Sequence, residues 1–107
     1  MYIIATCTNR IDLSQPYNDK FKAYREWATM VLDKALIYRV LSEKAFYKAM
    51  NKINKAISAS DSEKLKEIVE EALANSYSHS LYCQIFNGYS FSDGDYEAFV
   101  QIFEVRP

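Results

Sequence analysis

The C-terminal part of the chain decides the fold, because the spacing of its apolar residues changes there from helical to alternating. Residues 80–105 read SLYCQIFNGYSFSDGDYEAFVQIFEV. Residues 80–86 and 96–105 alternate with the period of two that is typical of strands. Between them, Asp93-Gly94 is a favourable turn, because Asp and Gly tolerate the positive φ angles of tight hairpins. We therefore predict a β-hairpin that pairs residues 80–86 with residues 96–105.

Both faces of this predicted hairpin are apolar. With a turn at Asp93-Gly94, odd positions of the first strand share a face with even positions of the second. Small and aliphatic side chains form one face, with Leu81, Cys83, Ile85, Ala98, Val100 and Ile102. Aromatic side chains mark the other face, with Tyr82, Gln84, Phe86, Phe99, Gln101, Phe103 and Val105, to which the first strand would add Tyr2 and Ile4. A sheet with one hydrated face is expected to be polar on that side, so a second apolar face indicates a function or a cover.

The first half of the chain predicts one strand followed by helices. Residues 1–7 are β-branched and alternating, which is typical of a strand. A polar stretch, residues 8–15, leads into a helix with Ser14 or Gln15 as its cap and Pro16 in its first turn. Its apolar stripe consists of Phe21, Tyr24, Ala28, Val31, Leu32 and Ala35.

Two further helical segments are expected before the hairpin. Residues 36–41 fit either a continuation of the first helix, which we favour, or a short strand ending at Ser42. Ser42 is the expected cap of the next segment, and Ser60 with Glu63 forms a capping box for the last. The charged side of that last helix is predicted to be solvated, with Lys64, Lys66, Glu67, Glu70 and Glu71.

These elements together predict an α+β fold. It has an N-terminal strand, two to three helices and a C-terminal β-hairpin, in a small antiparallel or mixed sheet with helices on one face. The chain has 107 residues, so we expect a single domain over residues 1–107 without a linker or tail.

Composition excludes several classes of function. The 13 basic and 14 acidic residues give a net charge of -1, so the chain lacks the excess of positive charge by which proteins attract nucleic acid, and we expect no nucleic-acid partner. No apolar run approaches the roughly 20 residues of a membrane span, and the N-terminus lacks the features of a signal peptide. We therefore expect a cytoplasmic, intracellular protein without a membrane partner, in which Cys7 and Cys83 are buried free thiols.

The aromatic face has three interpretations that the sequence leaves open. A helix could cover it, or the Asn87-Gly88 pair could form an earlier turn and shift the register. It could be a protein interface, most simply the two-fold contact of a homodimer. It could also be a ligand surface, although it carries no Lys or Arg to hold the phosphates of a single-stranded nucleic acid. Its glutamines suit a protein or a small molecule better.

Candidate chemistry is sparse. His79, the single histidine, lies four residues from Cys83, which in one extended strand separates them by roughly 13 Å, too far for a base to activate a thiol. Asp93, Asp95 and Glu97 fit the turn of a hairpin better than a calcium loop. We therefore predict no catalytic residue, no metal site and no cofactor.

One loop is a candidate anion-binding site. Thr8, Arg10 and Ser14 precede the first predicted helix, where hydroxyls, a guanidinium and a helix N-terminus would attract an anion. The loop lacks the glycines that let backbone amides surround a phosphate, which favours an ordinary helix entry.

The sequence therefore favours a non-enzymatic protein-binding module that self-associates and acts by occupying a partner. A homodimer or higher homo-oligomer is expected, together with an unidentified protein partner, as in small accessory or inhibitor proteins of phages and mobile elements. The alternative is a small-molecule or nucleotide-binding protein with its site at the strand–helix loop or between protomers.

Overall fold

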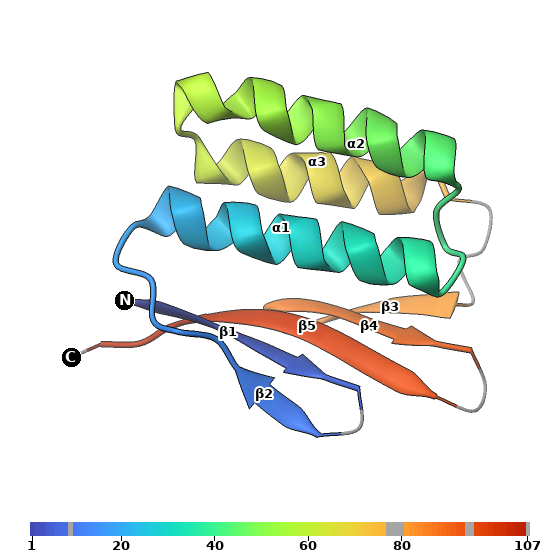
Figure 1. Ribbon diagram of the computed structural model, residues 1–107, viewed down its shortest axis with the longest axis horizontal. Helices are drawn as coiled ribbons and strands as arrows, with labels where there is room; N and C mark the ends of the chain where they lie inside the picture. Colours follow the sequence, from blue (N-terminus) through green and yellow to red (C-terminus); the bar gives the residue numbers. More distant parts are fainter. Residues whose placement is uncertain (9, 77–80, 94–95, 107) are drawn as a thin grey trace.

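The computed structural model describes residues 1–8, 10–76, 81–93 and 96–106. Within these residues the chain forms an α+β fold (Figure 1). Its elements are β1 (Tyr2–Cys7), β2 (Ile11–Leu13), α1 (Lys20–Ile37), α2 (Glu43–Ala56), the 3-10 turn η1 (Ile57–Ala59), α3 (Ser62–Ala74), β3 (Tyr82–Ile85), β4 (Gly88–Ser92) and β5 (Glu97–Glu104). The predicted fold class is confirmed.

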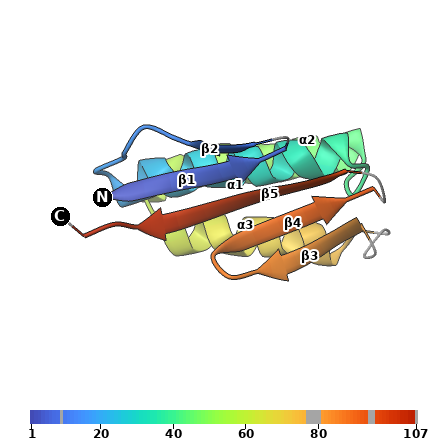
Figure 2. The same ribbon diagram turned by 90° about the horizontal axis from the view of Figure 1, so that it is seen from below.

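The sheet is antiparallel throughout, with the strand order β2-β1-β5-β4-β3. β5 therefore lies at the centre, between the N-terminal strand and the strand that precedes it in the chain. The helices lie on one side of this sheet, and Figure 2 shows the opposite side facing the viewer. The predicted placement of helices on one face is confirmed.

One hydrophobic core lies between the sheet and the helices. α1 packs on β1, β4 and β5, and α2 and α3 pack on α1 and on each other. The side chains of this core are almost fully shielded from solvent, among them Trp27, Val31, Leu32, Ile53, Leu65, Leu73, Ile4, Phe91 and Val100. α1 therefore forms the layer that joins the sheet to the other two helices.

The start of the first helix differs from the prediction. Ser14 does not cap it, because its hydroxyl accepts from the Ile4 N–H (2.9 Å) and donates to the Gln15 carbonyl. Residues before the helix instead extend the sheet, as β2 and as a bridge between Tyr2 and Tyr17. α1 begins only after Asp19, whose carboxylate accepts from the Lys22 N–H (3.2 Å).

The ambiguous segment 36–41 belongs only partly to the helix. α1 ends at Ile37, and Arg39 takes a left-handed conformation with φ 61° that reverses the chain. The Val40 N–H donates back to the Ala35 carbonyl (2.8 Å), a bond typical of helix ends. Val40 and Leu41 are then buried in the core. The favoured continuation of the helix is therefore wrong beyond Ile37, and no strand forms there.

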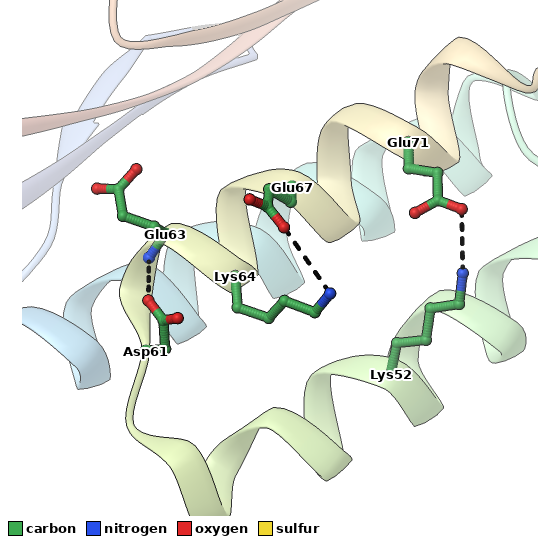
Figure 3. Close-up of polar contacts among 6 residues, drawn as sticks. All are labelled: Lys52, Asp61, Glu63, Lys64, Glu67 and Glu71. Atoms are coloured by element: carbon green, nitrogen blue, oxygen red, sulfur yellow. Dashed lines mark hydrogen bonds and ion pairs between the residues drawn. The ribbon is translucent and has the colours of Figure 1, made fainter.

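The caps of the other two helices were partly predictable. Ser42 caps α2 as expected, accepting from the Ala45 N–H (3.2 Å). α3 is capped one residue later than predicted, by Asp61, whose carboxylate accepts from the Glu63 N–H (3.1 Å; Figure 3). Ser60 has φ 50° and belongs to the turn that closes η1.

The C-terminal hairpin contains one strand more than predicted. β3 turns at Phe86-Asn87 into β4, and β4, not β3, pairs with β5. Asn87 has φ 63°, a left-handed conformation that Asn adopts more readily than most residues. Gly94, and with it the predicted Asp93-Gly94 turn, lies outside the described residues. The Asp93 N–H nevertheless donates to the Tyr96 carbonyl (3.1 Å), so the chain does reverse between β4 and β5.

Gly88 permits the close approach of the β3–β4 turn to β5. A Cβ atom at this position would lie 2.0 Å from the Val100 carbonyl oxygen and 2.9 Å from the Gln101 Cα. Both atoms belong to the backbone of a central strand, which cannot rotate away. Gly88 is therefore required for packing, whatever its backbone angles.

We predict that Gly88→Ala lowers the free energy of unfolding by at least about 2 kcal/mol, because the added methyl group must push β4 away from β5. Chemical denaturation followed by circular dichroism measures this. Ser90→Ala on the same strand is the control and should change stability by no more than about 0.5 kcal/mol. Equal stability of Gly88→Ala and the parent protein would contradict the close approach.

Candidate functional site

The face of the sheet opposite the helices is uncovered within the described part of the chain (Figure 2). The strand register assigns side chains to it, because residues paired across strands share a face. We call this surface the open face, and most of its members are apolar or aromatic. Its strand residues are Ile3, Ala5, Cys7, Ile11, Leu13, Cys83, Ile85, Gly88, Ser90, Ser92, Glu97, Phe99, Gln101 and Phe103.

Charge is nearly absent from the open face. Glu97, at the beginning of β5, is its single charged residue among the strands just assigned. The exposed aliphatic side chains of β2, Ile11 and Leu13, are 66% and 68% exposed. Phe99 and Phe103 lie on the central strand and are half-buried. A hydrated sheet surface normally carries charged or polar side chains, so this composition is unusual for a face that meets only water.

The open face, with its serines, Gln101 and Glu97 included, has the extent of a large surface patch. At about 3.3 Å per residue and about 4.8 Å between strands, five strands of this length cover about 400 Å². Apolar patches of about 300–600 Å² are the largest on typical monomeric proteins and are often functional.

Two predicted interface residues lie on the other face. Tyr82 and Gln84 pair with Phe91 and Tyr89 of β4, whose side chains belong to the core. The tyrosine hydroxyl donates to the Leu73 carbonyl at the end of α3 (2.9 Å). The predicted face was wrong here because the turn at Phe86-Asn87 pairs β3 with β4 and not with β5. This pairing turns the even-numbered side chains of β3 to the helix side and the odd-numbered ones to the open face. The earlier turn at Asn87-Gly88, one of the interpretations left open above, is close to what forms.

The other predicted interface residues divide between three places. Phe99, Gln101 and Phe103 lie on the open face as predicted. Tyr2 faces the helices, and its ring centroid lies 6.0 Å from that of Tyr24. Phe86 lies in the β3–β4 turn, 79% exposed, and its carbonyl accepts from the Gln101 amide (2.9 Å).

The predicted anion site does not assemble. Thr8 lies near the end of α1, where the Lys34 ammonium donates to its hydroxyl (3.3 Å). Arg10 forms an exposed ion pair with Asp12 (3.3 Å). The hydroxyl of Ser14 is engaged by backbone groups, and the first helix begins beyond it with the acidic cap described above. The three residues therefore have different partners, and an acidic cap disfavours an anion at this helix start.

The remaining candidates for chemistry lie partly outside the described residues. His79 and Asp95 lie outside the described residues, so nothing tests their predicted lack of function. Cys7 and Cys83 are free thiols, but Cys83 is exposed, which corrects its predicted burial. No group of three or more His, Cys, Asp or Glu side chains among the described residues is arranged to hold a metal ion. The described helices also include none that is both long and apolar enough to span a membrane.

Most of the charged side of α3 is exposed, as predicted, although Lys66 is half-buried. Figure 3 shows Lys64 paired with Glu67 on the same helix (3.8 Å) and Lys52 of α2 paired with Glu71 (3.4 Å). All four side chains are at least 42% exposed. Exposed pairs of this kind contribute between 0 and about 1 kcal/mol each, so they tie α2 to α3 only weakly.

One buried tyrosine titrates abnormally. Burial raises the pKa of Tyr89 from 10.0 to about 12, and the negative charge of Glu70 and the neighbouring Tyr82 add to the shift. The Tyr89 side chain is 5% exposed. Its hydroxyl therefore stays protonated, and remains a hydrogen-bond donor, through the physiological pH range.

We predict that Tyr82→Phe lowers the free energy of unfolding by about 1 kcal/mol, because the bond to the Leu73 carbonyl is lost. Thermal or chemical denaturation measures the change. The substitution should leave any self-association through the open face intact, since the ring lies on the helix side. Loss of association without loss of stability would place Tyr82 on the wrong face.

We predict an alkaline loss of stability that depends on Tyr89. A tyrosine whose pKa is raised by folding stabilises the fold fully below its ordinary pKa near 10, and this contribution disappears as the pH rises towards 12. This contribution should approach about 2 kcal/mol and be missing from Tyr89→Phe, which keeps only the alkaline loss caused by other groups such as Tyr38, whose pKa burial also raises. Chemical denaturation at a series of pH values measures it, and parallel stability profiles of the two proteins would contradict it.

Comparison of this chain with protein-family models, with curated proteins and with solved structures finds no match.

Proposed function

We propose that this protein is a non-enzymatic protein-binding module that self-associates through the open face of its sheet. The observation that carries the proposal is the uncovered, nearly uncharged surface centred on Phe99 and Phe103. Exposed apolar area of this size favours association, because burying it removes it from water.

A second copy of the chain is the partner that fits this surface most simply. The face is formed by antiparallel strands and has almost no charge, so two copies related by a two-fold axis would meet without electrostatic repulsion. Two sheets packed face to face lie about 10 Å apart with their strands about 30° from parallel. Phe99 and Phe103 of each copy would then fill the centre of the layer, and the helices would remain outside.

The area of the open face limits the strength of this contact. A symmetric pair would bury at least about 800 Å² in total, to which Phe86 and Val105 at the margins would add. Specific interfaces bury about 1,200–2,000 Å², and weak ones less. We therefore expect a reversible dimer whose population depends on protein concentration, and the same surface is available to another protein.

The biological role that fits such a surface is occupation of a protein partner, as small accessory or inhibitor proteins of phages and mobile elements do. Single-stranded nucleic acid suits the face less well, because the strands place no Lys or Arg there to contact phosphates. A nucleotide site at Thr8, Arg10 and Ser14 has less support, because those side chains have separate partners.

We predict that Phe99→Asp weakens self-association by at least about a hundredfold. The symmetric contact would bury a carboxylate from each copy without a partner, which costs about 3 kcal/mol or more. Sedimentation velocity over a wide range of protein concentrations measures the change. Tyr47→Asp is the matched control, because Tyr47 is an aromatic residue of α2 that is 63% exposed on the helix side.

Two results would contradict the proposal. One is a parent protein that stays monomeric at every concentration, and the other is equal weakening by the Tyr47 control. If Phe99→Asp unfolds the protein, as circular dichroism would show, Leu13→Asp replaces it. Leu13 is 68% exposed on an edge strand, so its substitution tests the open face without disturbing the core.

A further inference from the structure

A cavity lies on the helix side of the sheet, opposite the open face. It is bounded by α1, by α3 and by the β3–β4 turn, and its volume is about 210 Å³. Pockets for drug-sized ligands are larger, at about 300–1,000 Å³, so the cavity suits a molecule smaller than a nucleotide.

The inner wall of this cavity is apolar and well packed. Trp27, Tyr89 and Ile102 line it and are each no more than 5% exposed as whole residues. The ring centroids of Trp27 and Tyr89 lie 6.2 Å apart, and that of Tyr24 lies 5.8 Å from Trp27. These ring contacts give the wall a defined shape, as a site for an apolar side chain requires.

The polar part of the lining has unused hydrogen-bonding capacity. Glu70, Gln84 and Asn87 line the cavity, and their side chains form no hydrogen bond or ion pair with other described residues. The indole N–H of Trp27 also has no acceptor among the described residues, but it is fully buried and is not one of the groups that face the cavity. Convergent polar groups beside an apolar wall are the usual composition of a small-molecule site.

Two opposite charges line the cavity without pairing with each other. Lys66 and Glu70 are one helical turn apart on α3, yet the Lys66 ammonium bonds to Glu63 (3.2 Å). The same ammonium lies 4.8 Å from the centroid of the Tyr24 ring. An ammonium has three donors, so Lys66 can still donate to an anionic group in the cavity. The Glu70 carboxylate offers a matching acceptor for a cationic group.

The electrostatics keep Lys66 charged. Burial alone lowers the tendency of the ammonium to hold its proton, but the hydrogen bond to Glu63 and the neighbouring Tyr24 outweigh it and raise the Lys66 pKa. The cavity therefore presents a fixed positive charge beside the free carboxylate of Glu70.

We propose that this cavity binds a free amino acid with an apolar side chain. The α-carboxylate meets the Lys66 ammonium, the α-ammonium meets the Glu70 carboxylate, and the side chain packs on Trp27, Tyr89 and Ile102. Gln84 and Asn87, at the outer end, supply amide groups that can donate to the carboxylate or accept from the ammonium. A zwitterion fits because its two opposite charges lie close together, as the two helix side chains do.

The chain provides its own reporter for this proposal. Trp27 is the single tryptophan and lines the cavity, so its fluorescence reports what enters. Titration with L-leucine, L-isoleucine and L-methionine should give a saturable fluorescence change for at least one of them, with a dissociation constant of about 1 mM or tighter. Isopentylamine and 4-methylpentanoate, which each lack one of the two charges of leucine, should bind at least about tenfold more weakly, or about 1.4 kcal/mol.

Substitutions on α3 distinguish binding in this cavity from general effects of removing a charge from the helix. Glu70→Gln and Lys66→Met should each raise the dissociation constant of the best amino acid at least about tenfold. Glu71→Gln and Lys64→Met are matched controls on α3, because neither Glu71 nor Lys64 lines this cavity, and they should leave binding unchanged.

Three outcomes would overturn the proposal. They are no saturable change with any of the three amino acids, equal binding of the singly charged analogues, and equal weakening by the control variants. The helix-side charges that are changed are exposed or half-buried, so these variants are expected to fold, and circular dichroism checks this. The result does not depend on self-association, because Trp27 lies across the sheet from the open face.

Discussion

The contact of the β3–β4 turn with β5 is the constraint on which the rest of the molecule depends. Gly88 lies so close to the backbone of β5 that no side chain fits, and the Ile102 N–H donates to the Asn87 carbonyl (2.9 Å). The Gln101 side chain holds the same turn from the other face through the Phe86 carbonyl. Because the turn is held in this position, β4 occupies the place beside β5, and β3 becomes an edge strand. The even-numbered side chains of β3 then face the helices, not the open face as the sequence predicted.

Both surfaces with a proposed role follow from that arrangement. Reversal of β3 turns Tyr82 towards the helices, where its hydroxyl joins the end of α3. It also brings Gln84 beside Tyr89, so that the turn, α1 and α3 border the cavity, which is open to solvent on one side. On the other side, β4 contributes only glycine and serines to the open face, which leaves Phe99 and Phe103 of β5 as its main aromatic groups. The β3–β4 turn therefore determines the polarity of the open face and the shape of the cavity.

The two surfaces lie back to back on the same strands. Phe103 of the open face and Ile102 of the cavity are neighbours in β5, and their side chains point to opposite sides. A single layer of backbone separates the surface proposed to bind a protein from the cavity proposed to bind a small molecule. The helices do not cover the open face because all three lie on the opposite side of the sheet (Figure 2), where α1 packs on it and the end of α3 joins β3.

The sequence by itself determined the elements and their apolar faces, because these depend on residue type and spacing along the chain. The α+β class, the N-terminal strand, the Ser42 cap and the placement of Phe99 and Phe103 on one face of a strand could all be predicted. The boundaries of the elements could be predicted less well, because some residues can form two alternative hydrogen bonds. Ser14 could cap a helix or bond to β1, and only the formation of the sheet decided between them.

Only the tertiary structure decided which strands pair and which face each one presents. The alternating pattern of residues 80–92 is compatible with one long strand or with two strands and a turn, since both bury alternate residues. The choice depends on the fit of Gly88 against Val100, a contact between residues distant in the chain. The cavity could not be predicted from the sequence for the same reason. Its lining residues come from two helices and three strands, and only packing brings them together.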